Sequence, residues 1–401
     1  MEPIKWSALA HPRFKANPYP FYARMRAEAP VFPVSVPFVG RAWMVTRYED
    51  VITVATDDRF SRDVLPKLRW LPDFALVPLT RNMLSQDPPN HSRLRKLVSQ
   101  AFTPRRVERL RDRIQAVCDE LLEAAPRTGS FDLVRGYALP IPLTVISELL
   151  GIPKQDRRRF HTLVQGSIPI SAPSRILDIP IALPYVWLLT RYFRRLFAQC
   201  RARPGDDLLS ALVQAEEAGD RLDEDELLGM AMLLLLAGYE TTLHLIGSAA
   251  LALLEHPDQR ARFVNEPGLS NSAIEELLRY TSPVEITTPR IPRENVTLAS
   301  VTIPRGELVI GVLGSANHDE SVFKDPETLD LARDPNPHVA FGRGRHFCLG
   351  ASLARMEAQI ALTTLFARLP DLRLAQPAES LRWRKLLPLR GLTELPVAGL
   401  A

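Results

Sequence analysis

A cysteine near the C-terminal end of the chain stands in a setting that favours its ionised form. The segment reads Phe341-Gly342-Arg343-Gly344-Arg345-His346-Phe347-Cys348-Leu349-Gly350. Behind it, residues 351–369 contain few helix breakers and carry apolar residues at spacings of three and four, which predicts a helix. Cys348 is therefore expected at a helix N-terminus, where backbone N–H groups favour an anion. The neighbouring cationic side chains add to this preference, so we expect a thiolate, a strong electron-donating axial ligand for haem iron.

The fixed residues of this segment follow the pattern Phe-Gly-x-Gly-x-His-x-Cys-x-Gly. This resembles the haem-binding loop of the cytochrome P-450 superfamily, and the match holds at Phe341, Gly342, Gly344, His346, Cys348 and Gly350. Glycines ahead of the cysteine let a loop turn sharply and let its backbone approach a ligand closely. By the resemblance, Cys348 is the metal ligand, loop 341–350 binds the haem, and Gly350 lets the next helix lie near it. A buried structural cysteine beside a glycine turn is the alternative.

A long helix is predicted between residues 223 and 256. Asp223 and Glu226 form a start similar to a capping box, with Asp in place of Ser or Thr. About 33 residues at about 1.5 Å each give a rod of about 50 Å. The middle of this helix is apolar on all sides, so we expect it to be buried.

Polar residues interrupt that apolar middle in the sequence Ala237-Gly238-Tyr239-Glu240-Thr241-Thr242. A helical Gly costs about 1 kcal/mol and an unpaired buried carboxylate costs more. The Thr241 hydroxyl can compete for the Ala237 carbonyl and open the helix locally. The segment resembles the family's oxygen-activating motif. By that resemblance Thr241 and Glu240 are catalytic, the second as the acid, while Ala237 and Gly238 lie beside the haem.

Four cations stand at spacings that resemble the family's partners for the two haem propionates. His91 and Arg95 share one helical face at i, i+4, and Arg290 and His346 match two further positions. Buried anions need such partners. A solvated helix face is the alternative for the first two, and Arg293 could replace Arg290 if the register slips.

Glu276 and Arg279 are spaced i, i+3 on a predicted helix. An exposed pair of this kind contributes only about 0.2–0.5 kcal/mol. The pair also resembles the family's Glu-x-x-Arg, which braces the segment leading to the cysteine loop, so it is expected to be structural. Glu275 allows a one-residue error in register.

The candidate substrate pocket is apolar, which favours a lipophilic ligand. The family's pocket positions correspond here to Leu84, Leu234, Ala237, Val284, Ile286 and Leu387. Ordinary core packing is an equal alternative for these residues. The segment 154–203, with an apolar, proline-rich connection at 167–184, is interpreted as a mobile entrance lid.

The coarse element pattern predicts a mainly α fold with small β-sheets, an α+β minority. Paired strands are expected at 31–36 and 41–46, further strands at 296–303 and 308–313, and short strands about a turn at 390–391. Residues 59–89 are expected to form a long, irregular loop. Helices are expected at 19–28, 91–102, 104–125, 139–150, 154–166, 185–203 and 271–280.

Length and composition favour one large domain, residues 1–401, because no linker or repeat divides the chain. Fifty basic and 46 acidic residues give a net charge of +4, without the basic runs typical of nucleic-acid binding. Cys118 and Cys200 fit helical packing. The N-terminus lacks a signal-peptide core, and the apolar run 227–239 is too short to span a bilayer. We expect a cytoplasmic protein without a membrane span, and a monomer.

Taken together, the motifs resemble those of a soluble bacterial-type cytochrome P-450, over nearly the whole chain. The resemblance implies a single α-rich P-450 domain with haem b. It implies a monooxygenase of bacterial secondary metabolism that inserts one atom of O2 into a lipophilic substrate by hydroxylation or epoxidation. Electrons would come from NAD(P)H through a separate ferredoxin or flavodoxin and its reductase. The alternatives are a peroxide-driven peroxygenase and a non-catalytic haem-thiolate sensor.

The electron donor in this family is often acidic, so a basic face is a candidate docking surface. The residues that could contribute to it are Arg93, Lys96, Arg105, Arg106, Arg109, Arg343 and Arg345.

Overall fold

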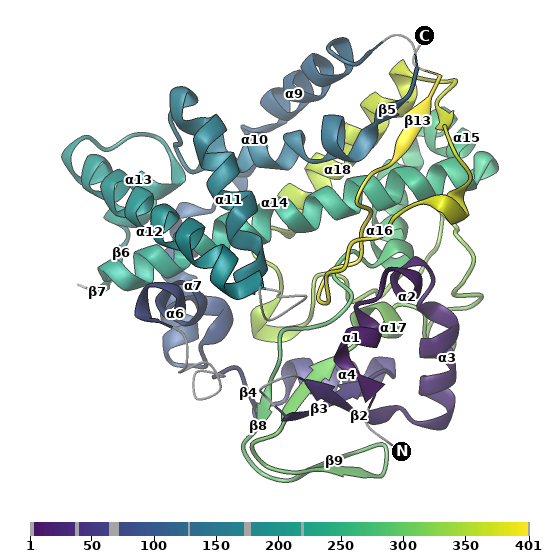
Figure 1. Ribbon diagram of the computed structural model, residues 1–401, viewed down its shortest axis with the longest axis horizontal. Helices are drawn as coiled ribbons and strands as arrows, with labels where there is room; N and C mark the ends of the chain where they lie inside the picture. The colour runs from purple at the N-terminus through teal and green to yellow at the C-terminus, as the bar shows by residue number, and fades with distance from the viewer. Residues whose placement is uncertain are drawn as a thin grey trace. The chain divides into compact units, whose positions relative to one another are not determined.

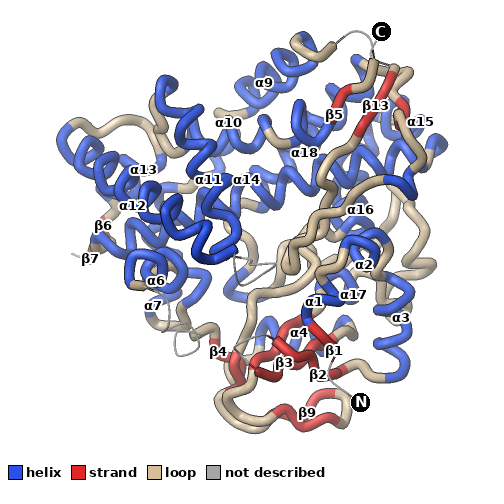
Figure 2. The backbone as a smooth tube through the Cα atoms, viewed as in Figure 1, coloured by secondary structure: helices blue, strands red, loops and turns tan. Residues whose placement is uncertain are grey.

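The computed structural model describes residues 4–36, 40–63, 72–126, 129–171, 178–217 and 220–399. The chain forms two compact units. Unit 1 comprises Met1–Phe60, Arg111–Pro142 and Glu240–Ala401, and unit 2 comprises Ser61–Leu110 and Leu143–Tyr239. Helices make up most of the chain and the strands are short, as Figure 2 shows. The expected fold class, mainly α with small sheets, is confirmed.

Unit 1 contains a small sheet with the order β1-β2-β3-β11. Strands β2 (Val31–Val36) and β3 (Gly40–Val45) are antiparallel, with Val31 opposite Val45. Strands β1 (Ile4–Lys5) and β11 (Leu308–Gly311) run parallel to β2 and β3 respectively. The predicted pair of strands is therefore confirmed, and the turn expected between them includes residues 37–39, which lie outside the described residues.

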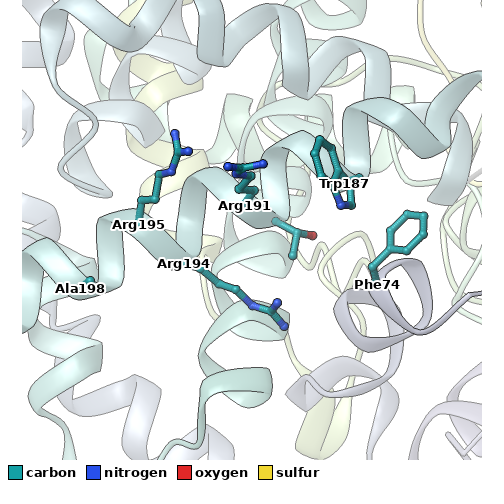
Figure 3. Close-up of a pocket in the computed structure, with 7 residues that line it drawn as sticks. Phe74, Trp187, Arg191, Arg194, Arg195 and Ala198 are labelled. Atoms are coloured by element: carbon teal, nitrogen blue, oxygen red, sulfur yellow. The ribbon is translucent and has the colours of Figure 1, made fainter.

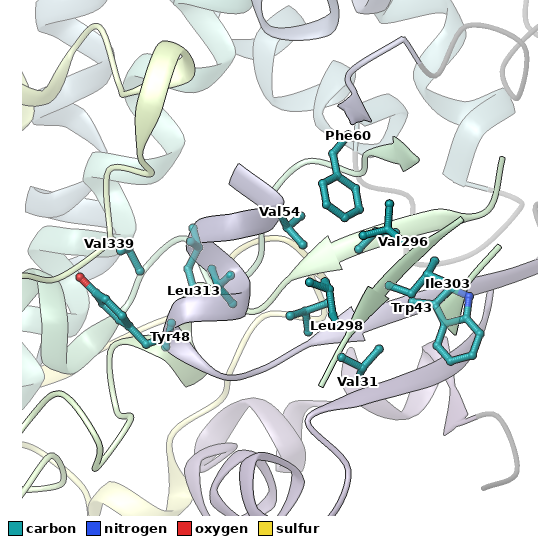
Figure 4. Packing of buried hydrophobic residues seen from close by; sticks show 14 of the residues in the cluster. Val31, Trp43, Tyr48, Val54, Phe60, Val296, Leu298, Ile303, Leu313 and Val339 are labelled. Carbon is teal, nitrogen blue, oxygen red and sulfur yellow. The ribbon is translucent and has the colours of Figure 1, made fainter. Parts of the chain in front are cut away.

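The sheet packs against a hydrophobic cluster in the same unit. Helix α4 (Tyr48–Thr56) and the hairpin of β9 (Val296–Leu298) and β10 (Val301–Ile303) supply much of it. Figure 4 shows their side chains converging with those of the sheet. The buried members are Val31, Trp43, Val45, Tyr48, Val51, Val54, Phe60, Val296, Leu298, Ile303, Val309, Leu313, Ala316, Phe323 and Val339.

Further helices of unit 1 position the cysteine loop. Helix α18 (Ala351–Arg368) begins directly behind it and contacts α9 (Arg111–Glu123), α15 (Pro257–Asn265) and α16 (Ser270–Thr281). Other elements of this unit are α1 (Trp6–Leu9), α2 (Pro12–Ala16), α3 (Tyr19–Glu28), β5 (Phe131–Asp132), a π-helical turn at Val134–Ala138, β8 (Ile291–Pro292), α17 (Leu313–Ala316), β12 (Arg373–Leu374) and β13 (Pro396–Ala398).

Unit 2 is almost entirely helical. Helices α11 (Arg157–Ser171) and α12 (Asp178–Ala202) pack side by side, as seen in Figure 1, and α12 also contacts α6 (Asp73–Thr80). Its other elements include 3-10 turns at Met83–Ser85 and Lys154–Asp156, α7 (Asn90–Ala101), α8 (Pro104–Glu108), α13 (Leu208–Gln214), β6 (Glu216–Glu217) and β7 (Asp220–Arg221). Strand β4 (Phe60–Ser61) and helix α10 (Pro140–Leu149) span the boundaries between the units.

Helix α14 (Glu224–Glu255) confirms the predicted long helix and its start. The Glu226 N–H donates to Asp223 Oδ1 at 2.8 Å, and the Asp223 N–H donates to Glu226 Oε2 at 3.1 Å. This reciprocal pair is a capping box. By length and composition α14 could cross a membrane, unlike the shorter apolar run considered from sequence. However, 72% of its most apolar window is buried, as in the core helix of a soluble protein.

Three expected elements are wrong in detail. Residues 59–89 are not irregular throughout, because α6 forms after Pro72 and tolerates Pro78 within it. The helix expected at 104–125 is broken by a turn at Arg109–Leu110. The connection expected at 167–184 is mostly helical, because α11 extends to Ser171 and α12 starts at Asp178. Pro184 lies inside α12, and residues 172–177 lie outside the described residues. In the first and third cases proline led to the wrong prediction, because packing can outweigh its lost hydrogen bond. No proline lies at the break at Arg109–Leu110.

Candidate active site

The cysteine loop is shaped by two glycines with left-handed backbone conformations. Gly342 has φ = 71° and Gly344 has φ = 69°, where other residues are strained. A 3-10 turn at Gly344–His346 follows, and the Cys348 N–H donates to the Phe341 carbonyl at 3.0 Å. This folds the loop back on itself and leaves the Cys348 side chain exposed, while Gly350 occupies the N-cap position of α18. The thiol thus lies just before the N-terminus of an 18-residue helix.

Arg355 contacts the cysteine loop, although the sequence analysis did not single it out. Its guanidinium lies 4.5 Å from the centroid of the Phe341 ring and donates to both Glu275 oxygens at 2.6 and 2.7 Å. These hydrogen bonds raise the pKa of Arg355, and negative charge at Cys348 acts in the same direction. A fixed cation therefore faces the cysteine loop. The sequence feature that could have identified Arg355 is its position two helical turns after Cys348 on the predicted helix.

Glu275 holds that cation in place. Burial alone raises the pKa of the Glu275 carboxyl, but hydrogen bonds from Arg355 and from His338, at 3.0 Å, bring it down to about 2. The carboxylate is therefore ionised throughout the physiological pH range. From the sequence, Glu275 is only an alternative to Glu276 as the partner of Arg279. In the structure the two glutamates have different partners.

The donor set fits haem iron held by one protein sulfur. An exposed thiol at a helix start, a nearby guanidinium and a loop with two left-handed glycines suit a thiolate ligand that must approach a macrocycle. Among the described residues, no group of three or more His, Cys, Asp or Glu side chains could hold a metal ion by themselves.

The residues of the predicted oxygen motif lie on an unbroken stretch of α14. The helix is α-helical through residues 237–242, so the local opening expected at Thr241 is not present as a break in the helix. Ala237 is exposed although it lies at mid-helix, which corrects the expectation that this middle is buried on all sides. A Cβ at Gly238 would lie 3.2 Å from Ile146, so α10 and α14 pack closely there.

Glu240 and Thr241 differ in their surroundings. Thr241 is partly exposed, whereas Glu240 and Thr242 are buried. Burial raises the pKa of Glu240 to about 7, and Arg384, whose Nη1 lies 3.3 Å from Oε1, acts in the opposite direction. A carboxyl with a pKa near 7 can both accept and donate a proton at neutral pH.

The predicted propionate partners are divided between the units. In unit 1, buried Arg290 is held by backbone hydrogen bonds to Val309, and its guanidinium donates to the carbonyl of Ala55 at 2.9 Å. His346 in the same unit is partly exposed in the cysteine loop. In unit 2, His91 is buried and Arg95 lies one turn further along α7, partly exposed.

Glu276 and Arg279 form a fully buried ion pair. The Arg279 Nε and Nη2 atoms donate to the two carboxylate oxygens at 2.8 Å each, and both side chains are 0% exposed. Arg279 also donates to the carbonyls of Asn317 and Pro326, while Glu276 accepts from Arg333. Because the irregular stretch of residues 317–336 is anchored at several points to α16, the chain reaches the cysteine loop along a fixed course.

The predicted substrate contacts form two groups. In unit 1, Val284 and Leu389 form a β-bridge. Ile286 and Leu387, each two residues from one member of this bridge, are buried. In unit 2, the turn holding Leu84 lies against α14, because the Met83 N–H contacts the sulfur of Met230, one turn before Leu234. None of these residues lines the groove of about 510 Å³ in Figure 3, which α6 and α12 form with Phe74, Trp187, Thr190, Arg191, Arg194, Arg195 and Ala198.

Comparisons with known proteins identify the family of this chain. The family model described as "Cytochrome P450" matches residues 268–370. The chain is 46% identical to "Cytochrome P450 107B1" of Saccharopolyspora erythraea, covering 94% of this chain and 93% of the relative. It is 44% identical to "Vitamin D(3) 25-hydroxylase" of Pseudonocardia autotrophica, covering 96% and 94%.

A solved structure gives the same result for the fold. The Bacillus subtilis bacillaene polyketide synthase cytochrome P450 PksS superimposes with a TM-score of 0.91 at 38% identity, covering 98% of this chain and 99% of that one. Similarity of this extent, together with the cysteine loop and the buried Glu276–Arg279 pair, shows that this chain belongs to the cytochrome P450 family of haem-dependent monooxygenases.

Proposed function

We propose that this chain hydroxylates a lipophilic small molecule, with Cys348 as the protein ligand of haem iron and with Glu240 and Thr241 delivering protons. The observation that carries the proposal is the cysteine loop, where an exposed thiol, left-handed glycines and the Glu275–Arg355 pair come together. When bound, haem b supplies the activation of dioxygen that protein side chains cannot provide. Every other role is assigned to residues of the chain.

Cys348 would bind the iron as a thiolate. The helix start behind it and the guanidinium of Arg355 favour negative charge on sulfur. Phe341, Gly342 and Gly350 would line the approach of the macrocycle, together with Ala237 and Gly238 of α14. His91, Arg95, Arg290 and His346 would bind the propionates.

Glu240 would hold the proton that Thr241 delivers. With a pKa of about 7, the Glu240 carboxyl is about half protonated at neutral pH. The Thr241 hydroxyl can then donate its proton and take up another from Glu240. The same pair of residues argues against the peroxide-driven alternative, whose sequences tend to carry Arg-Pro at these positions. The presence of both Glu240 and Thr241 also favours a catalytically active enzyme over a non-catalytic haem-thiolate sensor.

The substrate would be a lipophilic product of secondary metabolism. The pocket candidates Leu84, Leu234, Val284, Ile286 and Leu387 are all aliphatic, and one relative is named as a hydroxylase of vitamin D3. Residues 154–203, mostly α11 and α12, would act as the entrance lid. We further propose that residues 1–401 act as one catalytic domain.

Electrons must come from separate redox proteins. We propose a ferredoxin or flavodoxin with its reductase, drawing on NAD(P)H, and a cytoplasmic monomer as the acceptor. Some arginines of the candidate docking face already form ion pairs within this chain, so they are weaker candidates for binding an acidic electron donor. Arg345 binds Asp58, and Arg106 and Arg109 bind Asp206. Arg105 and Arg343 are exposed and remain the best candidates.

The experiment that tests this function starts from the carbon-monoxide adduct of the reduced, haem-loaded protein. We expect the red-shifted absorption of thiolate ligation, its loss in Cys348→Ser, and its retention in the control Cys200→Ser, since Cys200 is buried in α12. A normal spectrum in Cys348→Ser would contradict the assignment. Lipophilic compounds can then be screened by the spin-state change of the haem, and NADPH consumption coupled to product separates an enzyme from a sensor.

A further inference from the structure

A hairpin near the C-terminus lies against the second half of α14. Its strands pair through a bridge between Trp383 and Leu392, and the Arg384 N–H donates to the Gly391 carbonyl at 2.9 Å. A second bond, from the Thr393 N–H to the Arg382 carbonyl at 2.8 Å, closes the ladder. Arg384 is therefore held on a paired backbone, all of it within unit 1.

The hairpin backbone lies directly against a side chain of α14. A Cβ at Gly391 would overlap the imidazole of His244, one turn beyond Glu240. Because only a glycine fits there, the opposite residue of the hairpin, Arg384, is brought to the same part of the helix. Its Nη1 reaches Glu240 Oε1 at 3.3 Å.

The two partners differ in their access to solvent. The side chain of Glu240 is 10% exposed and that of Arg384 is 35% exposed. The Arg384 side chain therefore contacts the buried carboxyl through Nη1 and is itself about one-third exposed. Within the described part of the chain, Arg384 is the only ion-pair partner of Glu240.

The other titratable groups packed near this pair contribute little positive charge. Burial lowers the pKa of His244 to about 3, so its ring is neutral. Burial also lowers the pKa of Lys15 on α2, and that side chain is engaged by Glu285 and by the Leu387 carbonyl. Burial raises the pKa of Glu240, and Arg384 is the cation that acts against this from outside α14.

We propose that Arg384 is a positioning residue for proton delivery, which orients the Glu240 carboxylate and connects it to water at the protein surface. This rests on the proposed role of Glu240 as the acid. In one position the guanidinium holds the ionised carboxylate. When it turns toward solvent, the carboxyl can take up a proton from water and pass it to Thr241. Loss of the cation removes both the orientation and the electrostatic preference for the ionised form.

The first test measures the protonation of Glu240 without turnover. In haem-loaded, substrate-free protein, the carboxyl band that disappears in Glu240→Gln is followed by infrared spectroscopy across pH. Arg384→Gln is expected to move its midpoint upward by about one pH unit or more, because an opposite charge at this distance lowers a carboxyl pKa by about that amount. Arg384→Lys is expected to stay near the wild type. Arg382→Gln is the matched control, since Arg382 is 78% exposed on the same hairpin.

The second test measures coupling, with surrogate redox partners. Arg384→Gln is expected to lower the fraction of NADPH that yields product by at least about threefold and to increase the solvent isotope effect, with rescue by Arg384→Lys. If Arg384→Gln does not bind haem, Arg384→Met keeps the aliphatic stem and replaces it. An unchanged midpoint and unchanged coupling, or a Lys variant as impaired as the Gln variant, would overturn the proposal. Glu240→Gln that remains fully coupled would instead remove the role of Glu240 itself.

Discussion

At the scale of single residues, Glu275 and Glu276 show how two adjacent carboxylates take different tasks. Glu275 binds Arg355 and so faces the cysteine loop, whereas Glu276 binds Arg279 and Arg333 and fixes the chain that leads there. Helical geometry explains the division, because consecutive residues point about 100° apart around the axis. The sequence alone gives no means of telling which distant arginine each of the two carboxylates binds.

Removal of one partner from the buried pair should be far more damaging than removal from an exposed one. Arg279→Ala leaves Glu276 buried without its main partner, so we expect a loss of about 3–5 kcal/mol in the free energy of unfolding. The matched control is Arg262→Ala on α15, whose partner Glu266 is 50% exposed, with an expected loss below about 0.5 kcal/mol. Denaturant unfolding of the haem-loaded variants measures both. Equal losses would contradict a brace at Glu276.

Glu357 on α18 should make stability depend on pH. Burial raises its pKa to about 8, and Oε2 has no hydrogen-bond partner within the described residues. The folded protein then binds more protons than the unfolded chain between about pH 4.5 and 8, so stability falls as pH rises through that window. Glu357→Gln should remove this slope, a gain on the order of 4 kcal/mol at pH 8. Unfolding free energies at pH 5, 6.5 and 8 test it, with the exposed Glu123→Gln as control.

Thr241 carries the prediction that bears directly on the reaction. Thr241→Ala removes the hydroxyl next to Glu240, so we expect NADPH to be consumed with release of hydrogen peroxide and little product while haem stays bound. Thr242→Ala, one position further along the same helix and buried, serves as the comparison. Normal coupling in Thr241→Ala would remove this residue from its assigned role.

At the scale of elements, the contact between α14 and the C-terminal hairpin is set by a missing side chain. Gly391 allows the hairpin to reach His244, and the same register places Arg384 on Glu240. Arg390, next in the hairpin, lies 4.1 Å from the centroid of Trp383 and donates to the Lys15 and Ala16 carbonyls. Contacts on both sides thus fix the position of the hairpin, so it cannot easily move to make room for a Cβ atom at Gly391.

Gly391→Ala should therefore destabilise the protein by about 1–3 kcal/mol through overpacking. Combining it with His244→Ala should recover part of the loss, because the two changes share one space and are not additive. Gly268→Ala is the control, since a Cβ there meets nothing within 4 Å. Thermal or denaturant unfolding of the four proteins gives the coupling energy. Strict additivity would contradict the close approach.

At the scale of the whole molecule, charge decides how an electron donor is attracted. The net charge is only +4, and several arginines of the candidate docking face are already neutralised by carboxylates. Long-range attraction therefore depends on a few exposed cations rather than on the total. Its strength should fall with salt, because the Debye length is about 10 Å at 0.1 M.

Charge reversal at exposed positions tests this directly. Arg105→Glu and Arg343→Glu, made one at a time, should slow reduction by a ferredoxin several-fold at low salt and much less at high salt. Substrate-induced spin change should stay the same. The control Arg135→Glu, 68% exposed and outside the candidate face, should not respond. Equal reduction rates for all variants at low salt would exclude these residues from docking.

Local patterns determined much of this protein from sequence alone. The cysteine loop, the capping box of α14, the strand pair β2–β3 and helices α3, α7 and α16 all follow from spacing and turn chemistry within about ten residues. These signals are short-range, so folding cannot easily override them.

Tertiary structure alone decided which distant residues meet. Arg355 at Glu275, Arg384 at Glu240 and Gly391 at His244 join positions about 80 to 150 residues apart, and no local spacing encodes them. It also decided the helices α6 and α12, where packing outweighs the cost of an internal proline. Burial and ion pairing depend on neighbours from other elements, so the protonation of Glu240 and Glu357 could only follow once the chain was folded.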